Sequence, residues 1–421
     1  MQYRNLGKSG LKVSALSFGS WVTFHKQVDS KLAERMFGMC LDAGVNFFDN
    51  AEGYERGMSE IVMGEALKSL GRSRDSYCVS SKVFFGAHDN PLPTQMGLSR
   101  KHVTEACNQA LQRLQVDYLD LYFCHRADPD TPIEETVWAM HNLITQGKIL
   151  YWGTSEWTPE EISQAYEFAI GNNLTPPTME QPQYNLLDRQ RFEIEYNPIF
   201  EKYNMGTTTW SPLASGALTG KYLEGVPDGS RASLKGYEWL RKHMIDSDRG
   251  QERMQKVSAY IDIAKEHNLD PIKLAIAWCL LNKNVSTVIL GASNENQLEK
   301  NLSSIDYVDK FEDQELINNL NRCTPLDHEI IIIDNNSSDG SSFNSELQNF
   351  LSEDDLTIWV TNPNNVDAED QIWTSTGDSF VDSADNVHSI MTNGTNFAVM
   401  IGVSSITSDG TTSTFQQPLI L

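Results

Sequence analysis

The sequence predicts an α/β fold, a (β/α)₈ barrel with an N-terminal β-hairpin cap, followed by an acidic C-terminal tail. Eight short apolar segments alternate with longer segments, several of helical periodicity, as parallel strands and their crossover helices do. Three apolar segments end in Asp, Lys and His, and functional side chains of such barrels lie at the carboxyl ends of the strands. An abrupt change of charge near residue 326 indicates where the barrel ends.

Charge is distributed unevenly along the 421-residue chain, which has a net charge of −24. All 33 Lys and Arg residues precede residue 326, whereas 15 of the 57 Asp and Glu residues follow it. The composition therefore predicts two domains, a barrel over residues 1–325 and an unassigned tail over 326–421 that is β-rich or disordered. We do not expect such an acidic chain to bind nucleic acid, whose phosphates require a basic surface.

Three features predict the location of the protein. The sequence contains no run of about 18 apolar residues, so no membrane insertion is expected. No apolar core follows the first basic residue, as it would in a secretory signal. Six cysteines are scattered without a C-x-x-C pair, which is typical of reduced core residues. Together these features predict a cytoplasmic protein.

The predicted strands follow a β-hairpin over residues 3–13, which would close the floor of the barrel. Loops 84–99 and 211–249 are long enough to overhang the opposite, active face. The barrel strands are predicted at residues 13–18, 45–49, 77–82, 117–124, 149–154, 178–181, 206–210 and 287–291.

Helices are predicted at Lys31–Ala43, Lys101–Leu114 and Pro132–Gln146. The third would start with Thr131 as its N-cap and would end at Gly147. The first would bury a stripe made of Leu32, Met36, Met39 and Leu41.

Four residues in this frame suit the delivery of a proton to a carbonyl oxygen. Asp49, Lys82 and His125 stand at the ends of three predicted strands, and Tyr54 follows on the loop after Asp49. A lysine ammonium beside a phenol lowers the phenol pKa from its ordinary value near ~10. Asp49 would keep Lys82 charged, and His125 could donate a hydrogen bond to the carbonyl. One polar strand end is weak support for a site, but these four residues in this order predict catalysis without a metal.

These four residues resemble the catalytic tetrad of the aldo-keto reductase superfamily. Over about residues 3–321 the sequence is most similar to the voltage-gated potassium channel β-subunit branch, notably at 3–11, 97–102 and 230–237. The resemblance implies NADPH-dependent reduction of aldehydes or ketones to alcohols, with Tyr54 as the proton donor and a small carbonyl compound as the substrate. It also implies an alternative, a cytosolic regulatory module of a membrane channel that uses its cofactor as a redox sensor and could form a homotetramer.

The resemblance further implies an NADP(H) site across the barrel mouth, and no G-x-G-x-x-G follows a predicted strand to suggest a Rossmann domain. Phosphate sites of such barrels usually follow strands seven and eight. The implied cofactor-binding residues are Ser20, Trp21, Gln27, Asp49, Ser155, Gln181, Trp210, Ser211, Pro212, Leu213, Ala214, Ser215, Gly216, Lys221, Arg231, Gly291, Ser293, Gln297 and Asn301.

The sequence departs from the branch at four positions. Glu156 replaces an arginine, Lys300 replaces an acidic residue and Gly229 replaces an aromatic one, which leaves NADP and NAD both open as cofactors. At the fourth tetrad position the channel subunits have asparagine, whereas His125 is the residue of efficient reductases. This last departure favours turnover over the purely regulatory alternative.

The tail contains one stretch, residues 328–342, that resembles the nucleotide-binding strand and loop of family 2 glycosyltransferases. An isolated strand followed by an Asn/Ser/Asp/Gly turn explains the same residues. No later acidic metal motif supplies the rest of a sugar-nucleotide domain, so glycosyl transfer is not the favoured interpretation. Further strands are predicted at 356–361 and 397–407.

Overall fold

The computed structural model describes residues 1–21, 29–233 and 241–324, together with five strands further along the chain. The chain divides into two compact units, Met1–Thr324 and Pro325–Leu421.

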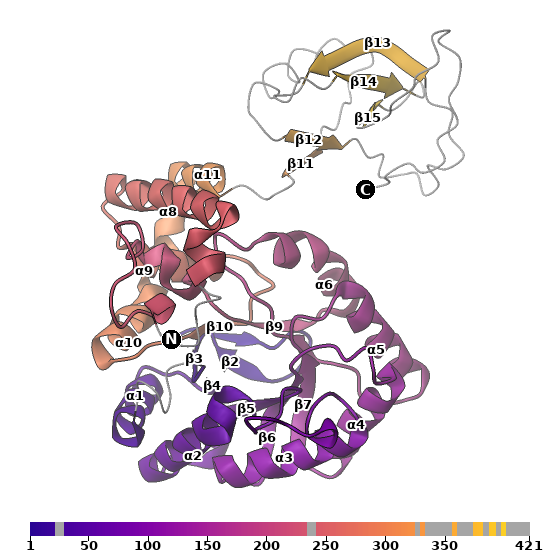
Figure 1. The fold of residues 1–421 in the computed structure, drawn as a ribbon, viewed down its shortest axis with the longest axis vertical. Helices are drawn as coiled ribbons and strands as arrows, with labels where there is room; N and C mark the ends of the chain where they lie inside the picture. Colours follow the sequence, from indigo (N-terminus) through magenta and orange to yellow (C-terminus); the bar gives the residue numbers. More distant parts are fainter. Residues whose placement is uncertain are drawn as a thin grey trace. The chain divides into compact units, whose positions relative to one another are not determined.

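Eight parallel strands of the first unit form a closed barrel in the spatial order β10-β3-β4-β5-β6-β7-β8-β9, which confirms the predicted fold class (Figure 1). The strands are β3 (Leu16–Gly19), β4 (Phe47–Asp49), β5 (Cys78–Val83), β6 (Leu119–Cys124), β7 (Ile149–Thr154), β8 (Met179–Glu180), β9 (Gly206–Thr209) and β10 (Thr287–Leu290).

Side-chain alternation along the strands divides the core into two layers. In β4, Phe47 belongs to the apolar cluster inside the barrel, whereas Phe48 packs between the barrel and the helices. The Phe48 ring lies 4.9 Å from that of Phe37 on helix α1 (Ser30–Asp42), measured between centroids. This period of two explains why strands buried on both faces have almost continuous apolar sequences.

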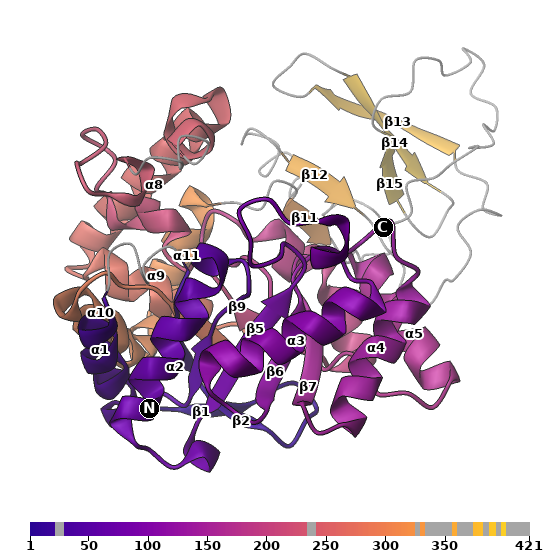
Figure 2. The same cartoon turned by 60° about the horizontal axis from the view of Figure 1, so that its bottom comes forward.

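The N-terminal hairpin consists of β1 (Tyr3–Asn5) and β2 (Lys12–Ser14), paired antiparallel. The predicted strand 13–18 is therefore two elements, because β2 belongs to the hairpin and the barrel strand starts only at Leu16. Leu6 and Val13 are fully buried and pack with the cluster inside the barrel. The hairpin thus closes one end of the barrel, where Figure 2 shows β1 and β2.

Helices surround the strands, as Figures 1 and 2 show. They are α1, α2 (Met58–Leu70), α3 (Arg100–Leu114), α4 (Ile133–Thr145), α5 (Pro159–Gly171), α6 (Asn197–Tyr203), α8 (Asp248–Glu266), α9 (Pro271–Cys279), α10 (Glu295–Leu302) and α11 (Gln314–Cys323).

Two details of the helix predictions are wrong. The buried stripe of α1 consists of Ala33, Met36, Phe37 and Cys40, so of the predicted residues only Met36 is fully buried. The Thr131 hydroxyl does not cap α4 but donates to Asp128 Oδ2 at 2.7 Å. Gly147 does end this helix, with φ +70° and its N–H donating to Ile144 O at 2.8 Å, the left-handed geometry that favours glycine.

In the second unit the structure describes five strands. β11 (Glu329–Ile332) and β12 (Leu356–Trp359) pair in parallel. β13 (Thr374–Val381), β14 (Val387–Thr392) and β15 (Phe397–Met400) form an antiparallel sheet. Strands at 356–361 and 397–407 were expected from the sequence, and β12 and β15 begin at these positions.

Candidate active site

Three neighbouring strands bring the predicted catalytic residues together. β4 ends at Asp49, β5 carries Lys82 and His125 directly follows β6. Tyr54 begins the short 3₁₀ helix η1 (Tyr54–Gly57) that follows β4. Lys82 Nζ donates to Asp49 Oδ2 at 2.7 Å and to Tyr54 Oη at 3.0 Å. The four residues therefore form one cluster at the carboxyl ends of the strands.

The remaining oxygen of Asp49 accepts hydrogen bonds from two side chains. Gln181 was predicted as a cofactor-binding residue, whereas Ser80 was not predicted to belong to the site. Ser80 Oγ donates to Asp49 Oδ1 at 2.8 Å, and Gln181 Nε2 donates to the same atom at 3.0 Å. Gln181 also donates to Thr208 Oγ1 at 3.0 Å. Asp49 thus accepts three side-chain hydrogen bonds, and such bonds allow a buried ion pair to persist.

Lys82 is completely buried but stays charged. Burial alone would lower the pKa of Lys82, but the charge of Asp49 and the hydrogen bonds to Asp49 and Tyr54 raise it above its ordinary value. An ammonium is thus fixed beside the phenol across the neutral pH range.

The expected net decrease of the Tyr54 pKa is not found. Burial of the phenol raises its pKa above the ordinary value, and this effect exceeds the opposing influence of the Lys82 charge. Tyr54 is consequently a neutral phenol with a proton to donate at neutral pH.

His125 stands beside Tyr54 with its ring mostly buried. The two ring centroids are 5.8 Å apart, and the Phe85 ring lies 5.1 Å from His125 on another side. Burial, with the nearby charges of Lys82 and Arg126, holds the pKa of His125 well below its ordinary value. His125 Nδ1 is buried and has no hydrogen-bond partner among the described residues. A neutral imidazole therefore offers one donor and one acceptor to this site.

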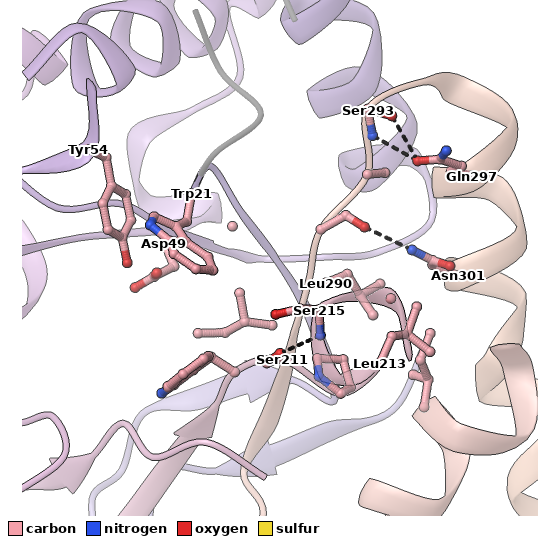
Figure 3. Close-up of a pocket in the computed structure, with 18 of the residues that line it drawn as sticks. Trp21, Asp49, Tyr54, Ser211, Leu213, Ser215, Leu290, Ser293, Gln297 and Asn301 are labelled. Carbon is pink, nitrogen blue, oxygen red and sulfur yellow. Dashed lines mark hydrogen bonds between the residues drawn. The ribbon is translucent and has the colours of Figure 1, made fainter. Parts of the chain in front are cut away.

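A cavity of about 780 Å³ extends from this cluster across the barrel mouth. Figure 3 shows Tyr54, Asp49 and Trp21 at one side of the pocket, Ser293, Gln297 and Asn301 at the other, and Ser211 and Ser215 between them. The predicted cofactor residues that line it are Trp21, Asp49, Ser155, Gln181, Trp210, Ser211, Pro212, Leu213, Ser215, Gly216, Lys221, Gly291, Ser293, Gln297 and Asn301.

The segment after β9 has an unusual backbone. Ser211, Ala214, Ser215 and Gly216 all have positive φ, with values from 47° to 94°. A Cβ atom built at Gly216 would lie 2.6 Å from Lys221 Nζ, the end of a flexible side chain, whereas the φ of +94° is what favours glycine at this position. Left-handed turns of this kind direct successive N–H groups to one side, which favours bound anions.

The segment after β10 is held by side-chain hydrogen bonds. Ser293 N and Oγ each donate to Gln297 Oε1 at 3.0 Å, and Asn301 Nδ2 donates to Gly291 O at 3.1 Å (Figure 3). These contacts fasten the loop to both ends of α10 at the wall of the cavity.

Four predicted cofactor residues are not placed on the wall. Ser20 is buried, and its hydroxyl donates to Asp49 O at 3.1 Å. Ala214 is 1% exposed and packs in the core. Gln27 lies outside the described residues, and so does the side chain of Arg231, whose backbone is in the 3₁₀ turn η6 (Arg231–Ser233).

Two cavity-lining residues near His125 were missed individually. Phe85 belongs to loop 84–99, which was expected over the active face, and Arg126 directly follows His125. The buried carboxylate of Glu52 accepts from the N–H groups of Phe84 and Gly86, at 2.8 and 2.9 Å, and so fixes the position of Phe85. Glu52 precedes these partners by 32 and 34 residues, so no local sequence pattern could have indicated the contact.

The departures at Glu156 and Lys300 have structural partners. Glu156 Oε1 accepts from the Trp210 indole at 2.9 Å and from Gln183 N at 2.6 Å, and Glu156 Oε2 accepts from Arg191 Nη1 at 3.0 Å. Glu156 thus supports the cavity-lining ring of Trp210. Lys300 Nζ pairs with Asp270 Oδ2 at 2.8 Å. Gly229 lines the cavity with φ +74°.

The described part of the chain lacks two features, a metal-binding cluster and a membrane-spanning helix. No group of three or more His, Cys, Asp or Glu side chains is arranged to hold a metal ion in the part of the chain that the structure describes. None of the helices described is long and apolar enough to cross a membrane.

Comparison with known proteins decides the family. The aldo/keto reductase family model matches residues 15–322. The chain belongs to the aldo/keto reductase family. It is 47% identical over 309 residues to a probable voltage-gated potassium channel subunit beta of Oryza sativa subsp. japonica, and 48% identical over 309 residues to a protein of the same description from Arabidopsis thaliana. Each match covers 73% of this chain and 92% of the relative.

The aldo/keto reductases are oxidoreductases that typically use nicotinamide cofactors. The predicted resemblance is therefore confirmed for the barrel. The family match ends before the stretch 328–342, and nothing in the comparisons supports the glycosyltransferase resemblance there.

Proposed function

We propose that this aldo/keto reductase reduces aldehydes or ketones to alcohols with NADPH, and that Tyr54 donates the proton. The observation that carries the proposal is the placement of the Tyr54 hydroxyl, 3.0 Å from a buried Lys82 ammonium and beside His125 at the wall of an open cavity. A general acid must be within reach of the atom it protonates, and this cavity gives a carbonyl oxygen room at that position.

The cavity fits a dinucleotide cofactor. The residues that would hold it are Gln181 and Ser155 near the cluster, the left-handed segment Ser211–Gly216 with Lys221, and Ser293, Gln297 and Asn301 at the far side. Backbone N–H groups and an ammonium suit phosphate groups, and the half-exposed Trp210 ring offers a stacking surface. When bound, the nicotinamide cofactor supplies the hydride of the reduction.

The chain's own residues perform the proton chemistry. Tyr54 gives its proton to the carbonyl oxygen as negative charge develops there, and Lys82 stabilises the phenolate that forms. Asp49 keeps Lys82 charged and oriented, and neutral His125 donates a hydrogen bond that orients the carbonyl. Burial strengthens each of these interactions because the local dielectric constant is low.

The pH dependence follows from the direction of the Tyr54 pKa. The protonated phenol is the active form for reduction, and its pKa is raised by burial above its ordinary value near ~10. The reduction rate should therefore be retained as the pH rises from 7 and should decrease only above about pH 10. Because the pKa of His125 is well below its ordinary value, His125 remains neutral throughout this range.

The test is NADPH oxidation by the Tyr54→Phe variant with a panel of aldehydes and ketones. Loss of the general acid should lower turnover by about 10²- to 10⁴-fold, while NADPH binding measured by fluorescence titration persists. Tyr3→Phe is the matched control, because Tyr3 is 51% exposed on the hairpin at the other end of the barrel. Unchanged turnover in Tyr54→Phe would show that Tyr54 is not the acid.

A second candidate function has one specific observation in its favour, the identity of 47–48% with proteins named as probable channel β-subunits. In this alternative the chain binds a membrane channel, as a homotetramer or otherwise, and reports the redox state of its cofactor. A stoichiometric membrane-protein partner, together with no turnover of any carbonyl in the panel, would favour it. Sedimentation of the purified protein measures the oligomeric state.

We also propose a cytoplasmic location, which six free cysteines support, five of them buried. We propose that the protein binds NADPH more tightly than NADH, because of its resemblance to the family. Titration with both cofactors, compared by their dissociation constants, tests this preference.

A further inference from the structure

Arg126 is the cation nearest in sequence to the proposed catalytic histidine. It directly follows His125, lines the same cavity and is half-buried. Its Nη1 donates to the carbonyl oxygen of His125, and the guanidinium carbon lies 5.9 Å from the centre of the Phe85 ring. These contacts hold the guanidinium close to the catalytic cluster rather than in open solvent.

The other charged residues of the cavity wall have different surroundings. Asp49 is paired with Lys82, Lys221 lies against Gly216 in the segment after β9, and Asp228 is exposed on loop 211–249. Within the described residues, no carboxylate oxygen lies within 4.0 Å of the Arg126 guanidinium. A guanidinium has five N–H donors, and one hydrogen bond to a carbonyl leaves most of them for another acceptor.

The charge of Arg126 acts at the reacting groups. Burial is the largest cause of the pKa shifts of both Tyr54 and His125, and the positive charge of Arg126 lowers the pKa of each. An anion bound at Arg126 would therefore lie near the carbonyl that these two residues bind.

We propose that the preferred substrates are aldehydes or ketones that also bear a carboxylate, and that Arg126 binds this carboxylate. A planar guanidinium matches a carboxylate in geometry and can form two parallel hydrogen bonds with it. One cation also balances one carboxylate charge. The aromatic side chains of Phe85 and Trp21 on the same wall suit an apolar or aromatic body between the two polar groups. This inference rests on the proposed reductase function.

A structural role is the competing explanation. Arg126 could serve only to hold the His125 carbonyl and to cover Phe85. Its removal would then disturb charged and neutral substrates alike, whereas carboxylate recognition changes the ratio between them. The ratio of kcat/KM values for a matched substrate pair therefore separates the two roles.

The experiment compares 4-carboxybenzaldehyde with its methyl ester, which has the same aldehyde and differs in charge. The 2- and 3-carboxy isomers vary the distance between the two groups. The variants are Arg126→Gln, Arg126→Lys and the control Arg72→Gln, which removes an exposed arginine paired with Asp42 outside the cavity. The wild type should prefer the acid of the best isomer by roughly 10-fold or more, and Arg126→Gln should remove this preference. Arg126→Lys should restore part of it, and Arg72→Gln should retain it.

Binding measurements keep the two proposals distinguishable. Calorimetry with 4-(hydroxymethyl)benzoate and its methyl ester, the corresponding alcohols, tests carboxylate binding without turnover. If neither aldehyde is reduced, the reductase proposal fails. Arg126 is still supported as the carboxylate-binding residue if calorimetry shows tighter binding of the acid than of the ester and Arg126→Gln removes this difference. Equal kcat/KM values for acid and ester in the wild type, or a preference that Arg126→Gln leaves intact, would overturn the inference.

Discussion

Asp49, Lys82 and His125, at one side of the cavity, are at most 8% exposed, whereas Gln297 at the other side is exposed to solvent. The first three stand on, or directly after, strands of the barrel, and their contacts join β4, β5 and Gln181, the residue after β8. Gln297 and its partner Ser293 belong to one short segment around the start of α10.

This difference separates two tasks. Hydrogen bonds between buried charges are strong because water does not compete, and leaving one unmade is costly. Exposed hydrogen bonds compete with water and contribute less. We therefore expect the buried side of the cavity to determine the rate and the exposed side to determine cofactor affinity. Four predictions test this division.

The largest effect is expected from breaking the Asp49–Lys82 pair. Lys82→Met leaves Asp49 buried without its cation, which should cost about 3–5 kcal/mol of stability and abolish turnover. The double variant Asp49→Asn, Lys82→Met removes both charges and should recover most of the stability in thermal denaturation. Its turnover should remain undetectable, because the phenolate at Tyr54 has no adjacent ammonium.

The comparison of these two variants separates folding from catalysis. A double variant that regains turnover together with stability would show that the ammonium serves only the fold. In that case the buried side of the cavity would be structural, and the proposed role of Lys82 would be wrong.

An intermediate effect is expected at Glu156, which holds the cavity-lining ring of Trp210. Glu156→Ala removes the acceptor for the Trp210 indole and for Gln183 N, so the ring should lose its fixed position. One hydrogen bond is worth about 1 kcal/mol, so the dissociation constant of NADPH should rise by about 5- to 10-fold. Glu156→Gln keeps an oxygen acceptor and should retain most of the affinity in fluorescence titration. Equal losses in the two variants would mean that charge, rather than the position of Trp210, determines the effect.

A smaller effect is expected at the exposed side. Gln297→Ala removes the acceptor of two hydrogen bonds from Ser293, and each exposed bond contributes less than about 1 kcal/mol. The dissociation constant of NADPH should rise by about 2- to 5-fold, with kcat unchanged. Glu299→Ala, on the exposed face of the same helix, is the control. A loss of kcat in Gln297→Ala would contradict the division of tasks.

The same contrast explains how much the sequence could predict. Apolar runs that end in Asp49, Lys82 and His125 are local patterns, and barrel topology converts them into neighbours. The buried stripe of α1 was predicted wrongly because two apolar stripes compete on that helix. Phe37 decides between them by packing against Phe18 and Phe48, contacts that only the folded chain contains.

Other properties depend on contacts between distant segments. The position of Phe85 requires Glu52, and the Thr131 hydroxyl is used by Asp128 instead of the helix. The Tyr54 pKa was expected to decrease because its cation could be inferred from the sequence, whereas the larger effect of burial could not. Charge partners are therefore easier to predict from sequence than the depth at which they are buried.

The smallest effect is expected from removing residues 326–421, which we propose form a domain separate from the barrel. Every described cavity residue precedes Thr324, and the family match ends at residue 322. Arg189 Nη1 donates to Thr324 O at 2.8 Å, so a chain that stops after Pro325 keeps this contact. Its kcat/KM and NADPH affinity should stay within about twofold of the full chain, because changes away from packed or charged sites usually cost less than about 0.5 kcal/mol. A shorter chain that stops at Leu320 is the control: it lacks Thr324 and the last turn of α11, so it loses the contact with Arg189 and its thermal midpoint should fall. If the chain ending at Pro325 aggregates or no longer binds NADPH, the second unit is needed for the fold, and both sides of the cavity depend on it.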